Sequence, residues 1–204
     1  MSKPPTVPSS TIPSVPHMDD EGFACFQAVL ADSACYLEYG SGGSTVYANN
    51  VAGIKAIVSV ESDRKWAEAV AGSLNKTSAK VLITHCDIGE VGAWGAPTDA
   101  RHMGRFWRYM AAPWDVARQH GLIPDTVLVD GRFRVASFLF SLLSARVGTT
   151  ILFDDYLDRP EYFVVEEFCR LKSRHGRLGL FEVVHDYATV DIVRRIAQYS
   201  VIPR

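Results

Sequence analysis

A glycine-rich turn between a short apolar run and the start of a helix constrains this chain more than any other feature. Residues 34–39 are mostly apolar, Gly40, Gly42 and Gly43 follow, and residues 44–48 suit the first turn of a helix. Glycine in such a turn accepts positive φ angles and brings bare backbone close to a ligand. The pattern predicts the first strand, loop and helix of a Rossmann-like unit, with a ligand across the turn.

Two residues in and beside this turn narrow the kind of ligand. Glu38 lies two residues before the first glycine, and Thr45 stands where a strict dinucleotide fingerprint has its third glycine. We expect an aminoacyl-nucleoside ligand rather than a nicotinamide dinucleotide. The alternative is a tight strand-to-helix connection with no ligand.

Two further apolar runs end in acidic residues. The run at 56–60 ends at Glu61, about 20 residues beyond the turn, where a carboxylate can accept hydrogen bonds from both ribose hydroxyls. The run at 80–85 leads to Asp87. The alternatives are an acidic cap for a helix over residues 63–74, which suits Ser62 or Asp63 better than Glu61, and a solvated loop aspartate at residue 87.

These motifs and their order resemble the class I S-adenosylmethionine (SAM) dependent methyltransferases over residues 34–200. The resemblance implies that the turn approaches the methionine part of SAM and that Glu38 helps bind its amino group. It also implies contacts of Asp87 and the backbone of Ile88 with adenine. The cofactor-binding residues expected in this way are Glu38, Gly40, Ser41, Gly42, Gly43, Ser44, Glu61, Ser62, Asp87, Ile88 and Asp130.

Three carboxylates follow the next two predicted strands. Asp130 ends the run at 125–130, and Asp154 and Asp155 end the run at 149–155, so all three point to the same sheet edge. They would repel one another unless protonated or bridged by a cation, and Mg²⁺ takes carboxylate oxygens. The pattern resembles the cation-dependent O-methyltransferases, which implies a metal bound by these residues. Phe133 stands where catechol-type enzymes have a lysine, so the resemblance is partial. Alternatively, Asp130 orders the cofactor loop and Asp154 or Asp155 caps the next helix.

Residues 89–120 form an aromatic-rich insertion of a length typical of binding loops and lids. It would cover the cofactor or build the acceptor pocket; alternatively, its aromatic residues pack a helix at 103–119 against the sheet. His102 lies inside it and is a candidate proton acceptor. With Asp130, it is our candidate catalytic residue.

The remaining pattern completes an α/β fold. Helices are expected at 19–31, 135–146 and 161–172, and strands at 178–184 and 188–193. We predict a Rossmann-like doubly wound sheet, mostly parallel with an antiparallel last strand and with helices on both faces. Residues 1–18 carry five prolines and should form an extended arm, which is either disordered or packed on the surface, or else lies over the SAM site or a neighbouring subunit. Residues 19–204 should form a single domain.

Composition narrows the function classes. The 204 residues are 48% hydrophobic and 22% charged, with a net charge of −2. Such a chain is globular, and it lacks the basic balance that favours a nucleic-acid acceptor. The cysteines show no metal-ligand spacing, and no run suits a secretory or membrane segment, so we expect a cytoplasmic protein. Monomer and homodimer both remain open.

The function predicted from the sequence is SAM-dependent methyl transfer, with O-methylation of a small molecule as its form. Two alternatives keep the same fold: a nicotinamide-dependent oxidoreductase and a non-catalytic SAM-binding module. The methyl acceptor is not indicated by any motif.

Overall fold

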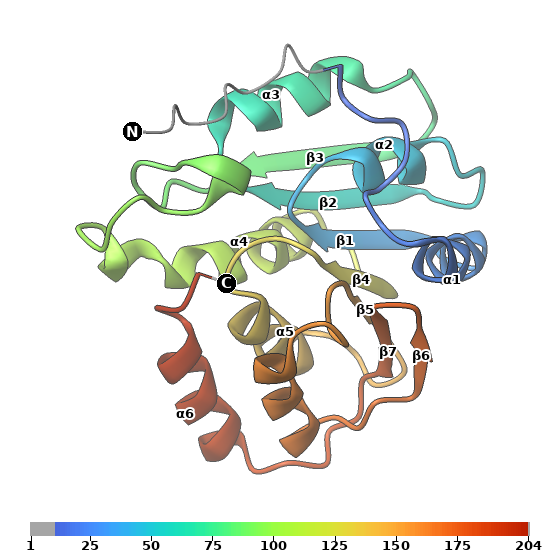
Figure 1. Ribbon diagram of the computed structural model, residues 1–204. Coiled ribbons are helices and arrows are strands. Elements are labelled where there is room, and N and C mark those ends of the chain that lie inside the picture. The colour runs from blue at the N-terminus through green and yellow to red at the C-terminus, as the bar shows by residue number, and fades with distance from the viewer. Residues whose placement is uncertain (1–10, 204) are drawn as a thin grey trace.

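The computed structural model describes residues 11–203 and contains one seven-stranded sheet (Figure 1). The first ten residues of the predicted arm thus lie outside the described residues. The strand order is β3-β2-β1-β4-β5-β7-β6. The strands are β1 (Cys35–Tyr39), β2 (Ala56–Glu61), β3 (Lys80–His85), β4 (Thr126–Val129), β5 (Thr150–Phe153), β6 (Ser173–His175) and β7 (Leu178–Glu182).

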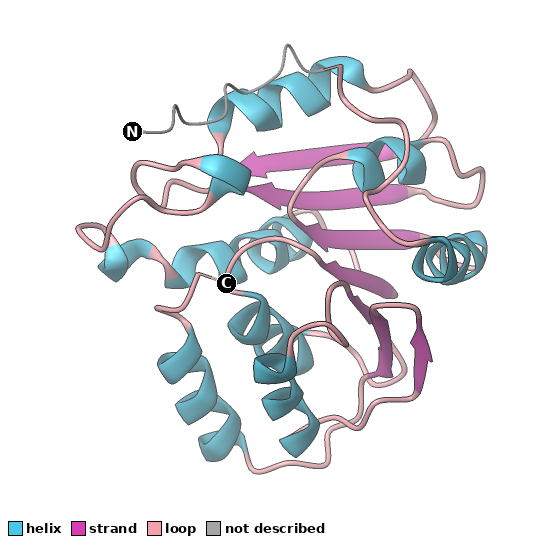
Figure 2. Cartoon of the chain, in the orientation of Figure 1, coloured by secondary structure: helices cyan, strands magenta, loops and turns pink. Residues whose placement is uncertain are grey.

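The pairing of these strands confirms the predicted sheet. Strands β1 to β5 are parallel, β7 is antiparallel to β5, and β6 is antiparallel to β7. Figure 2 shows helices on both faces of the sheet. The helices are α1 (Asp20–Ala31), α2 (Gly43–Asn49), α3 (Arg64–Ser73), α4 (Trp107–Gln119), α5 (Arg134–Ser144) and α6 (Thr189–Tyr199), with shorter 3₁₀ turns η1 (Ala93–Gly95), η2 (Met103–Arg105) and η3 (Pro160–Glu167).

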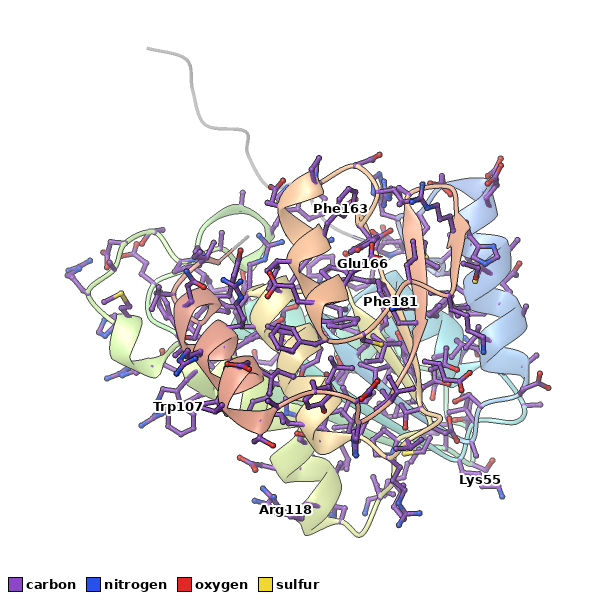
Figure 3. All side chains as sticks on the ribbon, turned by 90° about the horizontal axis from the view of Figure 1, so that it is seen from below. Lys55, Trp107, Arg118, Phe163, Glu166 and Phe181 are labelled. Carbon is purple, nitrogen blue, oxygen red and sulfur yellow. The ribbon has the colours of Figure 1, made fainter. Side chains whose placement is uncertain are left out.

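Alternation along the strands divides the core into two layers. Tyr36 packs with α1 and α2 on one face, whereas Leu37 and Tyr39 pack with α4 and α5 on the other. Phe138 of α5 stacks on Phe153 of β5 with ring centroids 5.5 Å apart. Phe181 of β7 is buried in this second layer (Figure 3). Because both faces of the central strands are covered, their sequences are apolar almost throughout.

One predicted strand is wrong. Residues 188–193 belong to α6, which runs to Tyr199. Ile192 is buried, and Ile196 and Tyr199 pack against the same core, a spacing of four and three residues that belongs to a helix. The apolar run at 188–193 taken alone suggests a strand. The helical period appears once residues 194–199 are included.

The predicted helix at 161–172 is also different. The chain forms η3 from Pro160 to Glu167 and then leaves the helical path. It goes on to form β6, which was not predicted, and a hairpin to β7 through Gly176 at φ 56°. Pairing with β7 therefore decides the conformation of this segment against its local helix pattern.

The carboxyl ends of the strands carry the irregular backbone of the molecule. Positive φ angles occur at three described residues other than glycine: Trp94 in the insertion, Phe133 after β4 and Asp155 after β5. Residues with such angles persist only where surrounding structure holds them, and they cluster at functional sites. In Figure 1 the arrowheads of β2 and β3 point toward the insertion, drawn in green, which borders this edge.

Candidate active site

Glu38 forms hydrogen bonds that stabilise the glycine turn and the start of α2. It lies at the sheet face covered by α2 and is fully buried. Its carboxylate accepts hydrogen bonds from the hydroxyls of Tyr36 at 2.9 Å, Ser44 at 2.7 Å and Thr45. Burial raises the pKa of Glu38, and these donors oppose the rise. Thr45 therefore has a structural use at the position where a dinucleotide fingerprint has glycine.

Glu61 holds the turn from the neighbouring strand. One of its oxygens, Oε1, accepts from the backbone N–H groups of Ser62 at 2.7 Å and Asp63 at 2.9 Å, and from the Ser62 hydroxyl. The other, Oε2, accepts only a longer bond of 3.2 Å from the N–H of Ser41. Burial raises the pKa of Glu61, and the backbone donors oppose it. Because a carboxylate has about four acceptor positions, Oε2 retains capacity for a ligand hydroxyl.

The turn contains a polar side-chain atom that has no hydrogen-bond partner among the described residues. The hydroxyl of Ser41 is buried and has no hydrogen-bond partner among the described residues. A side-chain carbon at Gly42 would meet nothing within 4 Å, so this backbone borders open space. Trp66 donates to the Ser41 carbonyl at 2.7 Å and fixes the turn. An unpartnered buried hydroxyl beside open backbone is what a polar ligand at this turn requires.

Asp87 and Ile88 differ sharply in exposure. The Asp87 side chain is 56% exposed and pairs with Arg105 at 2.8 Å, while Ile88 is fully buried. A backbone bond from Gly89 lowers the pKa of Asp87, helped by Arg105. The acid is thus ionised and accessible beside the end of β3.

The insertion packs partly in the core and partly at the surface. Phe106, Tyr109 and Trp114 are buried in the core and pack α4 against the sheet. Trp94 and Trp107, by contrast, are 84% and 55% exposed, and Figure 3 shows Trp107 at the surface. The loop that carries Trp94 lies directly over Glu61, because the Ser62 hydroxyl donates to the Gly95 carbonyl at 2.8 Å.

The loop after β4 packs tightly against the glycine turn. A side-chain carbon at Gly40 would lie 2.9 Å from Cα of Gly131, so the two backbones touch where β1 and β4 end. The hydroxyl of Tyr109 lies over the same point and accepts a long bond of 3.4 Å from the N–H of Arg132. The turn, the loop after β4 and the insertion therefore form one continuous wall.

Asp130, Asp154 and Asp155 lie at this edge, but arginines rather than one another surround them. Arg134 pairs with Asp130 at 2.8 Å and with Asp155 at 3.0 Å, and Arg177 pairs with Asp154 at 3.0 Å and Asp155 at 3.2 Å. Residues 11–203 contain no group of three potential ligands placed to hold a metal ion. The structure does not support the predicted cation site, because guanidinium groups already balance the carboxylates.

Asp130 and His102, the two candidate catalytic residues, are not neighbours. His102 packs on Gly89 beside the end of β3, whereas Asp130 follows β4. Strands β2 and β1 separate them, a span of about 14 Å at ordinary strand spacing. The structure therefore gives no shared constellation of these two groups.

The N-terminal arm packs against the glycine turn through residues that the sequence did not single out. The carbonyl of Val15 lies so close to Gly43 that no side chain fits there, and Pro16 is buried. The carbonyl of His17 accepts from Arg177. The glycine at position 43 was visible in the sequence, but nothing local indicated that residues 15–17 cover it.

Comparison with solved structures identifies the family. The chain aligns with a methyltransferase-like protein from Silicibacter pomeroyi at 34% identity and a TM-score of 0.83, covering 93% of this chain and all of that one. The chain belongs to the class I SAM-dependent methyltransferases. A methylase described as putative, from Haemophilus influenzae, shares the fold at 12% identity with a TM-score of 0.53, over 84% of this chain and 92% of that one. No protein-family model and no curated protein matches the chain.

Membership in this family confirms the predicted fold and the prediction of a SAM-dependent methyltransferase. It gives no support to the nicotinamide-dependent alternative. The contacts of individual residues with SAM stay predictions. Within residues 11–203 there is no helix with the length and apolar character needed to cross a membrane.

Proposed function

We propose that this methyltransferase binds SAM across the glycine turn and methylates an oxygen of a small-molecule acceptor held outside β4 and β5. The observation that carries the proposal is the unpartnered, buried hydroxyl of Ser41 beside the open backbone of Gly42. It lies beside Glu61, whose Oε2 atom accepts only one long hydrogen bond, from the N–H of Ser41, and so retains acceptor capacity.

The residues of this wall fit SAM by their chemistry. Glu61 would accept from the ribose, Asp87 from the adenine amino group, and Ser41 with Gly42 would meet the methionine part. Glu38 would act indirectly, since its oxygens already hold Ser44 and Thr45 in place. When bound, SAM supplies an activated methyl group, so positioning the acceptor and removing its proton are left to the protein.

Asp130 is the side chain best placed to take that proton. It follows β4 beside the turn, and its side chain is 28% exposed. Burial raises the pKa of Asp130 to about 7, with Arg134 opposing the rise and Asp154 and Asp155 adding to it. A base with a pKa near the working pH is efficient in proton transfer. The small size of the acceptor rests on the absence of a basic excess, with a net charge of −2.

Isothermal titration calorimetry with S-adenosylhomocysteine (SAH) and SAM tests the cofactor part. We expect saturable binding that weakens in Ser41→Ala, and no competition by NADH. Absence of binding at millimolar concentration contradicts the proposal.

Turnover on a panel of phenols, hydroxy acids, amines and sugars tests the acceptor part, with methyl transfer followed by mass spectrometry. Transfer to oxygen supports the proposal, and transfer to nitrogen contradicts it. SAM binding without transfer to any compound would favour the non-catalytic module.

A further inference from the structure

The carboxyl ends of β4 and β5 and the turn between β6 and β7 bring together what we call the arginine cluster. Ion pairs join six of its members, Asp130, Asp154, Asp155, Arg134, Arg159 and Arg177, and the seventh, Arg132, lies near Asp130 and Arg134. Four guanidinium groups thus meet three carboxylates. The cluster holds one positive charge that no carboxylate within it balances.

Arg134, Arg159 and Arg177 each form at least one ion pair with a carboxylate of the cluster. Arg134 is also tied to backbone carbonyls, donating to Asp154 at 2.8 Å and to Gly131 at 3.1 Å. Arg159 pairs with Asp155 at 3.0 Å and lies over the ring of Tyr162. These three arginines are therefore engaged within the protein.

Arg132 is the exception. It forms no ion pair with any residue that the structure describes, and its buried Nε has no hydrogen-bond partner there. Burial, together with the neighbouring Arg134, lowers the pKa of Arg132. A guanidinium that is partly withdrawn from water and has no counter-charge is costly unless an anion joins it.

The backbone around Arg132 is held in place. Phe133 has a left-handed conformation with φ 53°, and its buried ring packs against Phe106 at 5.0 Å and Tyr109 at 5.8 Å. A bulky residue persists in that conformation only where the surrounding structure holds it. The strained loop fixes the position of Arg132 two residues after Asp130.

We propose that Arg132 binds a carboxylate of the methyl acceptor and thereby directs the acceptor's hydroxyl toward Asp130. The planar fork of arginine matches a carboxylate with two parallel hydrogen bonds. One unbalanced positive charge matches one carboxylate, whereas a phosphate dianion would reverse the charge of the cluster. This inference rests on the proposed function, because it names the acceptor class of the same site.

The test is a titration of the full-length protein with acetate and benzoate, each matched by its neutral amide, acetamide or benzamide. Binding is followed by NMR at the Arg132 side-chain N–H, with and without saturating SAH. We expect benzoate to bind about tenfold or more tightly than benzamide. Arg132→Gln should remove that preference and leave the affinity for SAH unchanged.

The matched control is Arg118→Gln, which removes an exposed arginine at the far end of α4, labelled in Figure 3. It should keep the preference for the carboxylates. Arg132→Lys should keep part of it, since the charge remains but the fork is lost.

Three results would overturn the inference. The first is that neither acetate nor benzoate binds saturably at tens of millimolar. The second is that inorganic phosphate binds more tightly than both carboxylates. The third is that Arg132→Gln loses affinity for SAH, which would assign Arg132 to the cofactor. Failure of SAH to bind the unaltered protein would instead contradict the proposed function. The carboxylate titration without SAH would still test the role of Arg132.

Discussion

Buried or partly buried carboxylates occur at both halves of the sheet edge, and their partners differ. Beside β1 and β2, Glu38 and Glu61 accept from hydroxyls and backbone N–H groups, which are neutral. Beside β4 and β5, Asp130 and Asp155 meet the guanidinium of Arg134. No cation pairs with the carboxylates of the first half among the described residues, whereas arginines pair with those of the second half.

This difference matches the charges of the two ligands that we propose. SAM carries a sulfonium and an amino group, so negative charge beside the turn favours it. An acceptor with a carboxylate is favoured by the arginine cluster instead. On these proposals, the cofactor side and the acceptor side of the sheet edge differ in the groups that pair with their carboxylates, and not in the number of carboxylates.

The largest effect should come from removing the central cation of the second half. Arg134→Met leaves the partly buried Asp130 without its ion-pair partner and removes one of the three arginines that pair with Asp155, and we expect it to lower the free energy of unfolding by about 3–5 kcal/mol at pH 8. Urea denaturation measures this. Arg194→Met, which breaks an exposed pair with Asp191 on α6, should cost about 0–1 kcal/mol.

A similar loss in the two variants would contradict the contrast. If Arg134→Met does not fold, Arg134→Lys should fold with an intermediate loss, since it keeps the charge but not all the hydrogen bonds.

The cofactor half should respond mainly in binding. Glu61→Ala removes the acceptor that we assign to the ribose, and we expect SAH affinity to fall by about 1.5–3 kcal/mol, or roughly 10- to 150-fold. Calorimetry measures the affinity, and Glu68→Ala on the exposed face of α3 is the control. Unchanged affinity in Glu61→Ala would remove Glu61 from the cofactor site.

Removing Glu38 should lower the free energy of unfolding only because neutral hydrogen-bond donors lose their acceptor. Glu38→Ala leaves the hydroxyls of Tyr36, Ser44 and Thr45 without their acceptor, which should cost about 1–3 kcal/mol. Urea denaturation again gives the value, and Glu68→Ala should stay within about 0.5 kcal/mol of the unaltered protein. A loss as large as that of Arg134→Met would erase the difference between the two halves.

The last prediction concerns the change of stability with pH. The pKa of Asp130 is raised to about 7 in the folded protein from an ordinary value of 3.8, so the folded state holds its proton over that window. Its contribution to stability is present at low pH and is lost as pH rises from about 4 to 7. Asp130→Asn should therefore gain stability relative to the unaltered protein over this range. A difference that does not change with pH contradicts the raised pKa.

Local sequence was enough to place the parts of the fold that depend on near neighbours. The turn at Gly40 to Gly43, the cap of α3 at Asp63 and the strands ending at Glu61 and Val129 all lie where predicted. Each of these features depends on backbone conformation or apolar periodicity within a few residues, so it can be predicted without knowledge of distant contacts.

Only the tertiary structure decided what the carboxylates at the strand ends meet. Three acids at one edge predicted a bridging cation, yet Arg177 reaches Asp154 from a hairpin formed by a strand that was not predicted, and also contacts His17 in the arm. The charge balance of a buried group depends on side chains that are distant in sequence. The sequence therefore determined where the acidic residues stand, and long-range packing determined that arginines neutralise them and that Arg132 is left over.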